Sequence, residues 1–233
     1  MKLKRKFYLV TAAALFFIGL GIYLGFWQLG RAAQKQTLQA AMQAQANQIP
    51  LDAQGLAQLP DLAGGLHRPV RVAGTWEPAH TVYLDNRQMD GKVGFFVLTP
   101  LRLQGSGQIV VVQRGWAARN FEFRDQLPAI QTPPGLVEVQ GQIAPPPSKL
   151  YEPGAPGAGV IRQNLDLGRF QDETGLALAE FTIRQTGSAS EGLSRNWPAV
   201  ALGLEKHYGY AFQWFALSGL ILGLYFWFYF FRR

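Results

Sequence analysis

The residues best suited to chemistry stand where the chain enters its last apolar segment. Four of them have the i, i+3, i+4, i+7 spacing that places side chains on one face of a helix: His207, Tyr210, Ala211 and Trp214. An imidazole among aromatic side chains at a membrane surface offers what axial ligation of a lipophilic haem requires, namely a neutral nitrogen donor beside apolar walls. The same residues are typical of an interfacial anchor that binds no ligand. The spacing alone leaves both interpretations open.

Two long uncharged stretches predict the elements that position this face. Residues 7–30 and 208–231 each contain 24 residues without a charge. A helix of that length extends about 36 Å, which exceeds the roughly 30 Å of hydrocarbon in a bilayer. We therefore predict transmembrane helices over 7–30 and 207–231. The first stretch is too long for a typical signal-peptide core and lacks a convincing cleavage pattern, so it predicts an uncleaved signal anchor.

The distribution of charge predicts the orientation of these helices. Of the 22 basic residues, four precede the first stretch and two follow the second, whereas all 15 acidic residues lie between the stretches. Basic ends stay in the cytoplasm, and long domains cross the membrane largely regardless of their own charge. Residues 1–6 and 232–233 are therefore expected in the cytoplasm and residues 31–206 outside it. The net charge of +7 reflects this topology and attraction to lipid headgroups, and it requires no nucleic-acid partner.

The cysteine and histidine content limits the metal chemistry of the chain. The absence of cysteine excludes disulfides, thiolate metal sites, Cys-x-x-Cys redox motifs and covalent haem attachment. The three histidines are scattered, at His67, His80 and His207. A metal centre built from several histidines of this chain alone is therefore not expected.

Between the apolar stretches the sequence predicts an α+β domain dominated by an antiparallel β-sheet or a small barrel. Five strand-like segments are separated by short turns: 70–76, 81–87, 94–99, 109–113 and 136–143. Residues 109–112 are apolar on both faces, which predicts an interior strand. Residues 31–48 predict a helical extension of the first span, and 165–174 predict a short helix. Residues 181–184 predict a last strand, and the polar segment 187–196 is expected to be mobile.

No catalytic motif stands out in this domain. The sequence has no nucleophile elbow, phosphate-binding loop, dinucleotide fingerprint or His-Glu-x-x-His helix. Three arginines after strand-like segments are candidates for binding an anion: Arg87, Arg114 and Arg119. Arginines in such positions more often form ordinary ion pairs.

Residues near the end of the first span are expected at the same membrane level as His207. Trp27 suits the interfacial aromatic belt, and the polar Gln28 requires a partner or water. Arg31 and Lys206 would be available there to the propionates of a haem.

Each span also contains a Gly-x-x-x-Gly pattern, at 21–25 and at 219–223. Small residues four apart allow two helices to approach closely, which favours pairing of the spans. Glycine is also common enough in membrane helices for the pattern to arise by chance.

Several short motifs, in order along the chain, resemble one known family. They are Gly25-x-Trp27-Gln28-x-x-Arg31, Asn86-Arg87, Gly94 with Thr99-Pro100, Arg114-Gly115-Trp116, and His207-x-x-Tyr210-x-x-Gln213-Trp214-Phe215. Their succession between two spans resembles the Surfeit locus protein 1 (Shy) family of cytochrome c oxidase assembly factors. The resemblance covers nearly the whole chain. Gln113 departs from the pattern, because Asp or Asn is more usual before the Arg-Gly-Trp motif.

The resemblance implies a non-enzymatic factor that helps haem A reach the catalytic subunit of cytochrome c oxidase. It implies His207 as the ligand of the haem iron, with Tyr210 and Trp214 on the same helix. It implies Trp27, Gln28 and Arg31 as residues of the haem environment or of helix packing. The expected partners are the oxidase catalytic subunit, haem A synthase and the lipid bilayer. No mitochondrial presequence precedes the first span, so a bacterial inner membrane is expected, with the central domain in the periplasm.

Two alternatives belong to other functional classes. In the first alternative the chain is a cofactor-free scaffold for an oxidase assembly intermediate, which predicts that substitution of His207 has no effect. It would act as an enzyme on a membrane lipid or quinone if it shows a turnover that depends on Asp85 or Arg114.

Overall fold

The structure is a computed structural model that describes residues 2–59, 62–123, 126–152, 157, 159–198 and 202–231. Side chains are described from Phe7 onward, except at Leu62 and Ala63. The chain forms two compact units, one from its two ends (1–41 with 200–233) and the other from residues 42–199.

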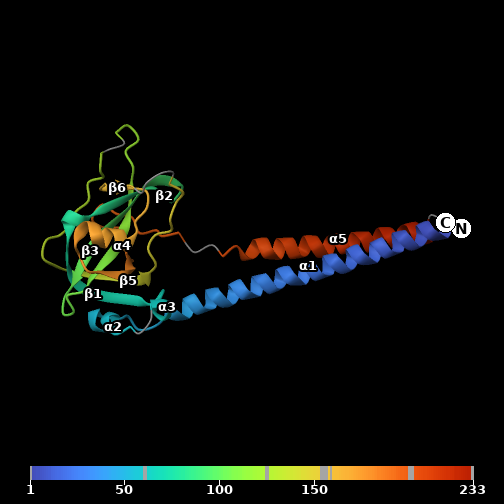
Figure 1. The fold of residues 1–233 in the computed structure, drawn as a ribbon, viewed down its shortest axis with the longest axis horizontal. Coiled ribbons are helices and arrows are strands. Elements are labelled where there is room, and N and C mark those ends of the chain that lie inside the picture. Colours follow the sequence, from blue (N-terminus) through green and yellow to red (C-terminus); the bar gives the residue numbers. More distant parts are fainter. Residues whose placement is uncertain are drawn as a thin grey trace. The chain divides into compact units, whose positions relative to one another are not determined.

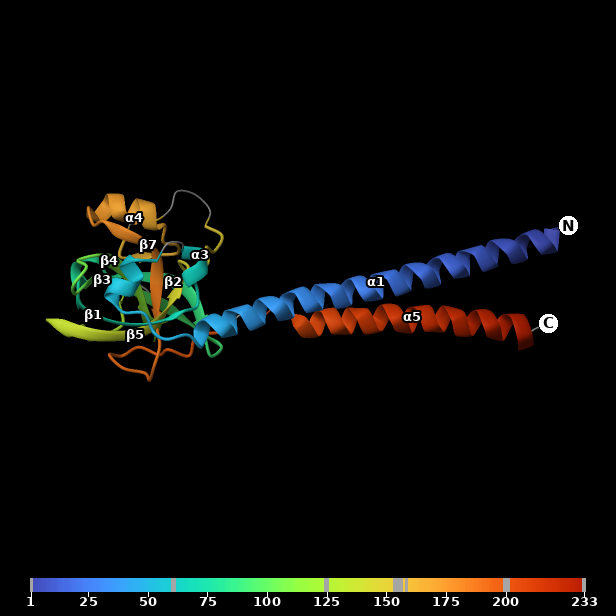
Figure 2. The ribbon, with the colours of Figure 1, turned by 90° about the horizontal axis from the view of Figure 1, so that it is seen from below.

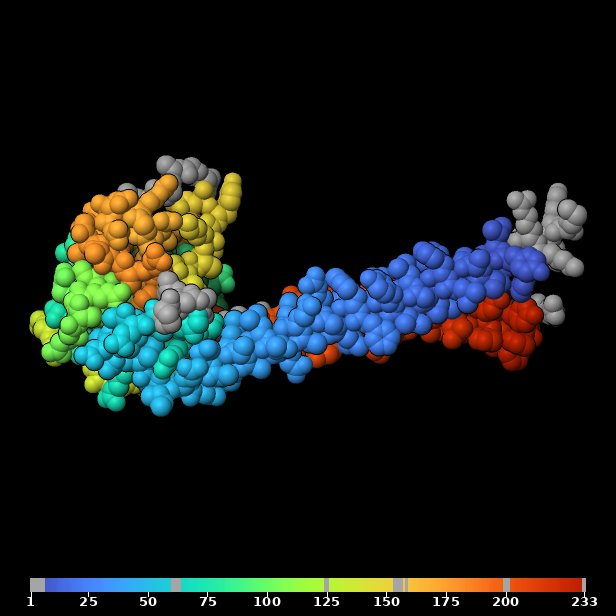
Figure 3. Space-filling view, turned by 60° about the horizontal axis from the view of Figure 1, so that its bottom comes forward, coloured from blue at the N-terminus to red at the C-terminus, as the bar shows by residue number. Residues whose placement is uncertain are grey.

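The first unit is a pair of antiparallel helices, α1 (Lys2–Ala46) and α5 (Leu204–Phe231). Figures 1 and 2 show them side by side, with the beginning of α1 next to the end of α5, and Figure 3 shows atoms of α1 directly against those of α5. Both helices are long and apolar enough to cross a membrane. Residues 31–46 continue α1 without a break, so the expected extension and the first span are one helix.

A line of buried and half-buried residues runs along each helix where the two meet. On α1 its members recur at alternating intervals of three and four: Thr11, Ala14, Ile18, Gly21, Gly25, Gln28, Ala32 and Lys35. On α5 the matching line is His207, Ala211, Trp214, Ser218, Ile221, Tyr225 and Tyr229. An average spacing near 3.5 residues keeps the same line facing the neighbour when two helices pack at a shallow angle. These two lines together are called the seam below.

The two glycines of the Gly-x-x-x-Gly pattern of α1 lie in the seam, whereas the two of the α5 pattern do not. A Cβ atom on Gly21 would collide with the hydroxyl of Ser218, and one on Gly25 would stand 2.5 Å from the ring of Phe215. Among the described residues, no atom lies within 4 Å of a Cβ placed on Gly219 or Gly223. The pattern of α1 therefore permits helix pairing, and the expectation that the pattern of α5 takes part is wrong because it faces away.

Oxidation of the double variant Gly21→Cys with Ser218→Cys is expected to link α1 to α5 in most molecules. A Cβ on Gly21 lies 3.5 Å from the Cβ of Ser218, within the range of about 3.5–4.5 Å seen in disulfides. The chain has no cysteine of its own to compete. The link is measured by whether the two helices stay joined on a non-reducing gel after proteolysis between them. Gly21→Cys with Gly219→Cys is the matched control, and equal linkage in both variants would contradict the helix register.

The second unit is a β-rich domain. Its strands are β1 (Pro69–Trp76), β2 (Val82–Met89), β3 (Lys92–Leu103), β4 (Ile109–Ala118), β5 (Leu136–Ala144), β6 (Ile161–Arg162) and β7 (Leu178–Gln185). Five strands close into a barrel in the order β1-β5-β7-β4-β3, with β3 pairing back to β1, while β2 and β6 extend the sheet from β3 (Figure 1). The predicted class is confirmed: two apolar helices flank an α+β domain built on a small barrel.

The barrel closes because β3 is long enough to serve two neighbours in turn. Residues 92–98 of β3 pair with β2, and residues 101–103 pair with β1. The barrel interior is apolar: Val70, Val72, Trp76, Leu101, Leu103, Val110, Val112, Val139, Ile143, Phe181 and Ile183 belong to one buried cluster. Val111 belongs to a second cluster, so β4 is buried on both faces as its apolar run predicts.

Short helices cover parts of this barrel. They are α2 (Ala53–Ala57), α3 (Leu62–Gly65), η1 (Pro78–His80) and α4 (Leu167–Thr174). The side chain of Asp166 caps α4 by accepting a hydrogen bond from the backbone N–H of Arg169, and Gly175 ends the helix in the left-handed conformation. Phe170 of α4 is buried beside Val111, so this helix covers the face of the sheet opposite the barrel interior.

The sheet is dominated by antiparallel pairings, as predicted, and it contains two parallel pairings, β7 with β4 and β6 with β2. One expectation about the domain needs correction. The segment 187–196 is packed onto the domain, where Ser194 exchanges two backbone hydrogen bonds with Trp116 and Leu193 is buried. The pairing of β7 with β4 ends at Gln113, and Ser194 pairs with β4 further along, at Trp116.

Candidate functional site

His207 and Gln28 meet at the seam of the helix pair. The Nδ1 atom of His207 lies 2.7 Å from the Oε1 atom of Gln28. A carbonyl oxygen only accepts hydrogen bonds, so Nδ1 carries the proton and donates it. In the neutral ring the other nitrogen, Nε2, then holds the lone pair and can act as a ligand. The two polar residues that were expected at one membrane level are thus direct partners.

The surrounding seam holds this pair in register. Ala32 and Ala211 are buried in the seam one turn from Gln28 and His207, and their small side chains let the helices approach. Ala32 and Ala211 lie on opposite sides of the pair, and beyond Ala32 the Nζ atom of Lys35 donates to the backbone carbonyl of Leu202 at 2.7 Å. The small, polar seam therefore positions the imidazole from both sides.

Two further polar contacts fix the helices along their length. The hydroxyls of Thr11 and Tyr225 are 2.9 Å apart near the other end of the pair. The hydroxyl of Ser218 donates to the backbone carbonyls of Trp214 at 3.0 Å and Ile18 at 3.3 Å. Hydrogen bonds between membrane helices oppose sliding because a displaced polar group finds no water in the hydrocarbon.

The other predicted site residues border one side of the His207–Gln28 pair. Trp27 directly precedes Gln28, and Arg31 follows Gln28 by three residues. Lys206 and Tyr210 have the same two positions relative to His207. In antiparallel helices these positions lie on the same side of the seam. Trp27 and Tyr210 are 47% and 52% exposed, and the Arg31 guanidinium lies over the Trp27 ring at 5.5 Å. Trp214 is half-buried in the seam itself, two turns further along α5.

The described residues of this region show no cluster of side chains suited to an ordinary metal ion. Among the described residues, no three side chains of His, Cys, Asp or Glu gather where they could hold an ion. A protein site for zinc or a similar ion needs three or four such ligands. His207 offers one nitrogen, which suffices only for a metal that brings most of its ligands with it.

The motifs of the β domain converge on Trp116. Its indole N–H donates to the backbone carbonyl of Arg87 at 2.9 Å. Gly94 leaves the space for its ring, because a Cβ there would stand 2.6 Å from the ring atoms. Asn86, with φ of 59°, forms a bulge in β2 immediately before Arg87. These motif residues therefore have packing roles in the structure.

Arg114 is fully buried beside Trp116. It is the extra residue of a bulge in β4, between the pairs Leu98–Gln113 and Val97–Gly115. Its guanidinium lies 4.7 Å from the centre of the Trp76 ring. It donates to Thr132 Oγ1 at 2.8 Å, to the Gln131 carbonyl at 2.7 Å and to Glu191 Oε2 at 2.9 Å. These contacts favour the ordinary ion-pair interpretation over an anion site.

The other two candidate arginines are also paired within the domain. Arg87 donates to the backbone carbonyls of Ser148 and Gln163, each at 2.7 Å, and burial lowers its pKa. Arg119 contacts both carboxylate oxygens of Asp85 at 3.1 Å. Gln113, which departs from the family pattern, donates to Thr182 Oγ1 at 2.7 Å inside the domain.

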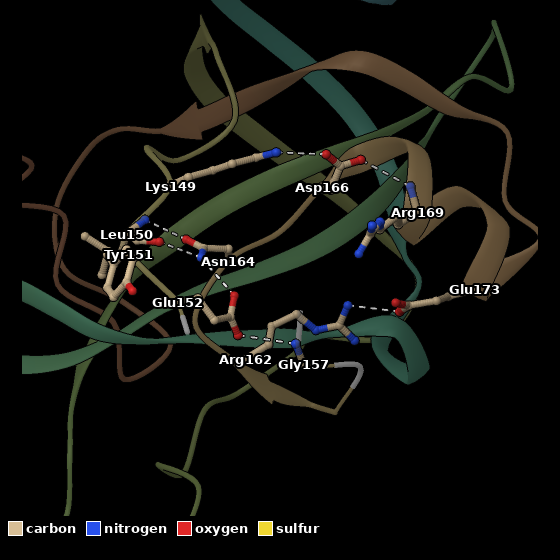
Figure 4. A pocket seen from close by; sticks show the side chains of 10 residues that line it. All are labelled: Lys149, Leu150, Tyr151, Glu152, Gly157, Arg162, Asn164, Asp166, Arg169 and Glu173. Carbon is tan, nitrogen blue, oxygen red and sulfur yellow. Dashed lines mark hydrogen bonds and ion pairs between the residues drawn. The ribbon is translucent and has the colours of Figure 1, made fainter. Parts of the chain in front are cut away.

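A polar pocket of about 410 Å³ lies beside α4 (Figure 4). Its side chains are largely matched in pairs: Lys149 with Asp166 at 3.0 Å, Arg162 with Glu173 at 2.9 Å and Asn164 with Glu152 at 3.0 Å. The hydrogen bond from Lys149 holds the pKa of Asp166 below its usual range. No serine, cysteine or histidine is among the lining residues that the structure describes.

The sequence interpretation missed several residues that the structure makes important. Ser218 and Lys35 complete the seam, and the alternating three-and-four spacing of its small and polar members was a usable signal. Glu191 and Arg195 lie in the segment expected to be mobile, but they pair with each other and with Arg114. The pairing of Glu191 with Arg114 has no local sequence signal, because these two residues are far apart in the chain.

Comparison with known proteins identifies the family to which the chain belongs. A sequence model of the SURF1 family matches residues 15–219, which include Gln28 and His207. A SURF1-like protein of Rickettsia felis is 28% identical over 212 residues, covering 88% of this chain and 89% of that protein. A SURF1-like protein of Rickettsia bellii is 27% identical over 211 residues, covering 88% and 84%.

A shorter match links the chain to a named eukaryotic protein. The cytochrome oxidase assembly protein SHY1 of Saccharomyces cerevisiae is 28% identical over 98 residues, covering 42% of this chain and 25% of the yeast protein. The family match spans the β domain and the part of the seam from Ile18 to Lys35 on α1 and from His207 to Ser218 on α5. The chain therefore belongs to the SURF1 family, as its succession of motifs predicts.

Proposed function

We propose that this protein is an assembly factor for cytochrome c oxidase that holds haem A through the Nε2 atom of His207 before the oxidase catalytic subunit receives it. The assembly role is supported by family membership and by the name of the yeast relative. The haem-binding role is supported by one observation, the hydrogen bond from His207 Nδ1 to Gln28 that leaves Nε2 free.

The chemistry of the donor set fits this cargo. A bound haem supplies four equatorial nitrogens to its iron and requires only axial ligands from a protein. His207 would supply one ligand to a bound haem, and its Nδ1–H already has the hydrogen-bond partner that ligating histidines usually have. Trp27 and Tyr210 provide exposed aromatic surface on one side of the pair, and Arg31 and Lys206 provide positive charge for propionates.

A transfer protein benefits from this modest set of contacts. One axial nitrogen from a half-buried residue holds the cargo less tightly than two axial ligands in an enclosed pocket. His207 lies near the start of α5, and its flanking residues are exposed. The side chains of this site therefore bind and orient the haem without enclosing it, which suits delivery.

The proposed setting is the inner membrane of a bacterium. The basic ends of the chain favour cytoplasmic termini and a periplasmic β domain. The two apolar helices provide the membrane anchor. The proposed partners are the catalytic subunit of the oxidase and haem A synthase. The role is non-enzymatic, in keeping with an assembly-factor family.

The function is tested by complementation of a bacterial strain that lacks its own SURF1-family protein. The wild-type chain is expected to restore haem a content and oxidase activity in membranes, and His207→Ala is expected to restore several-fold less. His80→Ala is the matched control, because His80 lies in η1 of the β domain, and it should act as wild type. Failure of the wild-type chain, produced at normal levels, would overturn the assembly role.

The same experiment separates this proposal from a cofactor-free scaffold. A scaffold depends on the apolar faces of the helices and on the β domain, and it does not use the imidazole of His207. Full restoration of the oxidase by His207→Ala would therefore remove the haem-binding role and leave the scaffold as the better account.

A further inference from the structure

We infer that Gln28 is a positioning residue that selects the tautomer of His207 and aims its Nε2 atom. This inference rests on the proposed function for its biological purpose. The geometry itself does not depend on any ligand, because the Nδ1 to Oε1 distance of 2.7 Å belongs to the protein alone.

The hydrogen bond is specific because the neighbouring polar groups have other partners. Lys35 donates to the carbonyl of Leu202, and Arg31 lies over Trp27 and donates to Gln34 at 3.3 Å. Among the residues that the structure describes, Gln28 is the only hydrogen-bond partner of the His207 ring. Gln28 therefore decides alone which ring nitrogen carries the proton.

The location of Gln28 supports a functional reason for its polarity. It occupies the seam between Gly25 and Ala32, where an apolar residue of similar size would pack without the cost of desolvating an amide. A ligating histidine is commonly oriented by a hydrogen bond from its other nitrogen, and loss of that partner typically weakens metal binding about 10–100-fold. A polar residue at this one seam position is therefore explained by what it does to His207.

The variants that test this role differ in whether they offer an acceptor. Gln28→Leu keeps the approximate size of the side chain and removes the hydrogen-bond acceptor. Gln28→Glu replaces the amide oxygen with a carboxylate oxygen, which can still accept the Nδ1 proton. Gln36→Leu changes an exposed glutamine of the same helix and serves as the matched control. The cysteine pair introduced by Gly21→Cys and Ser218→Cys, placed in each background, reports whether α1 and α5 still pair.

The first measurement is nitrogen NMR of the His207 ring in the full-length, haem-free protein in detergent. At a pH where the ring is neutral, the wild-type protein and Gln28→Glu are expected to show a protonated Nδ1 and an unprotonated Nε2. Gln28→Leu is expected to lose this preference while the helices still form the cysteine link. A wild-type ring protonated at Nε2 alone, or an unchanged ring in Gln28→Leu, would overturn the inference.

The second measurement is titration of the same proteins with haem A, followed by absorption. Gln28→Leu is expected to bind about 10–100-fold more weakly than wild type, whereas Gln28→Glu and Gln36→Leu remain close to it. Wild-type affinity in Gln28→Leu would overturn the positioning role even though haem binding stands. If the wild-type protein binds no haem A, the proposed function fails, while the tautomer assignment is judged by the NMR result.

Discussion

Replacing Glu191 with alanine is expected to lower the free energy of unfolding of the β domain by about 3–5 kcal/mol. The Oε2 atom of Glu191 accepts hydrogen bonds from Arg114 at 2.9 Å and from Arg195 at 3.4 Å. Arg114 is 0% exposed, so removal of the carboxylate leaves a buried positive charge without its counter-ion. Burial lowers the pKa of Arg195, and the charge of Glu191 offsets part of that shift.

The measurement is denaturant unfolding of the full-length protein in detergent, followed by tryptophan fluorescence. Glu191→Gln separates charge from shape, because it keeps an acceptor at the same backbone position, and a smaller loss is expected. Glu180→Ala is the matched control, since Glu180 is an exposed residue of β7, and it should stay within about 0.5 kcal/mol of wild type. A Glu191→Ala variant as stable as this control would show that Arg114 does not depend on the ion pair.

The ion pair also explains why a polar segment is well packed. Arg195 donates from Nε to the backbone carbonyl of Arg114 at 2.8 Å, and Trp197 donates to the carbonyl of Gln185 at 2.7 Å. Gly115 makes room for this segment, because a Cβ there would stand 2.8 Å from both Leu193 Cβ and the carbonyl oxygen of Ser194. The Arg-Gly-Trp motif thus attaches the segment that precedes α5 to the barrel.

Much of the fold could be predicted because its signals are local. The run of apolar residues at 109–112 predicts an interior strand, and β4 is buried on both faces. The turn at Asp90-Gly91 has positive φ at both residues and joins β2 to β3, and an Asp-Gly pair is a typical signal for such a turn. Asp166 precedes a helix that it caps. In each case the neighbouring residues alone determine the structure.

The remaining features depend on contacts between distant parts of the chain. Closure of the barrel requires the end of β3 to reach β1, and β7 joins β4 in parallel only after the chain has passed through α4. Glu191 and Arg195 look like solvated residues because their partner, Arg114, is about eighty positions away along the chain. Composition cannot distinguish a solvated charge from a buried pair of this kind.

The candidate site shows the same division. The aromatic and basic residues at the membrane level, Trp27, Arg31 and Tyr210, could be named from their types and spacing, and helix geometry places them on one side of the pair. The contact between Gln28 and His207 depends on the register of two helices. That register is set by Gly21, Gly25 and Ser218, and their role becomes clear only when both lines of the seam are known.

Replacing His207 with alanine is expected to remove haem A from the purified protein. His207 is the one histidine of the helix pair, since His67 and His80 lie in the β domain. No other described cluster of side chains offers a metal site. Loss of the axial nitrogen should exceed the effect of losing its orienting partner, so binding should weaken by more than about 100-fold.

Ligation of haem A by His207 is tested by the absorption spectrum of the full-length protein purified from cells that make haem A. We expect haem bands in the wild-type protein and in His80→Ala, and their loss in His207→Ala, with the cysteine link between α1 and α5 still forming. Wild-type haem occupancy in His207→Ala would contradict this ligation.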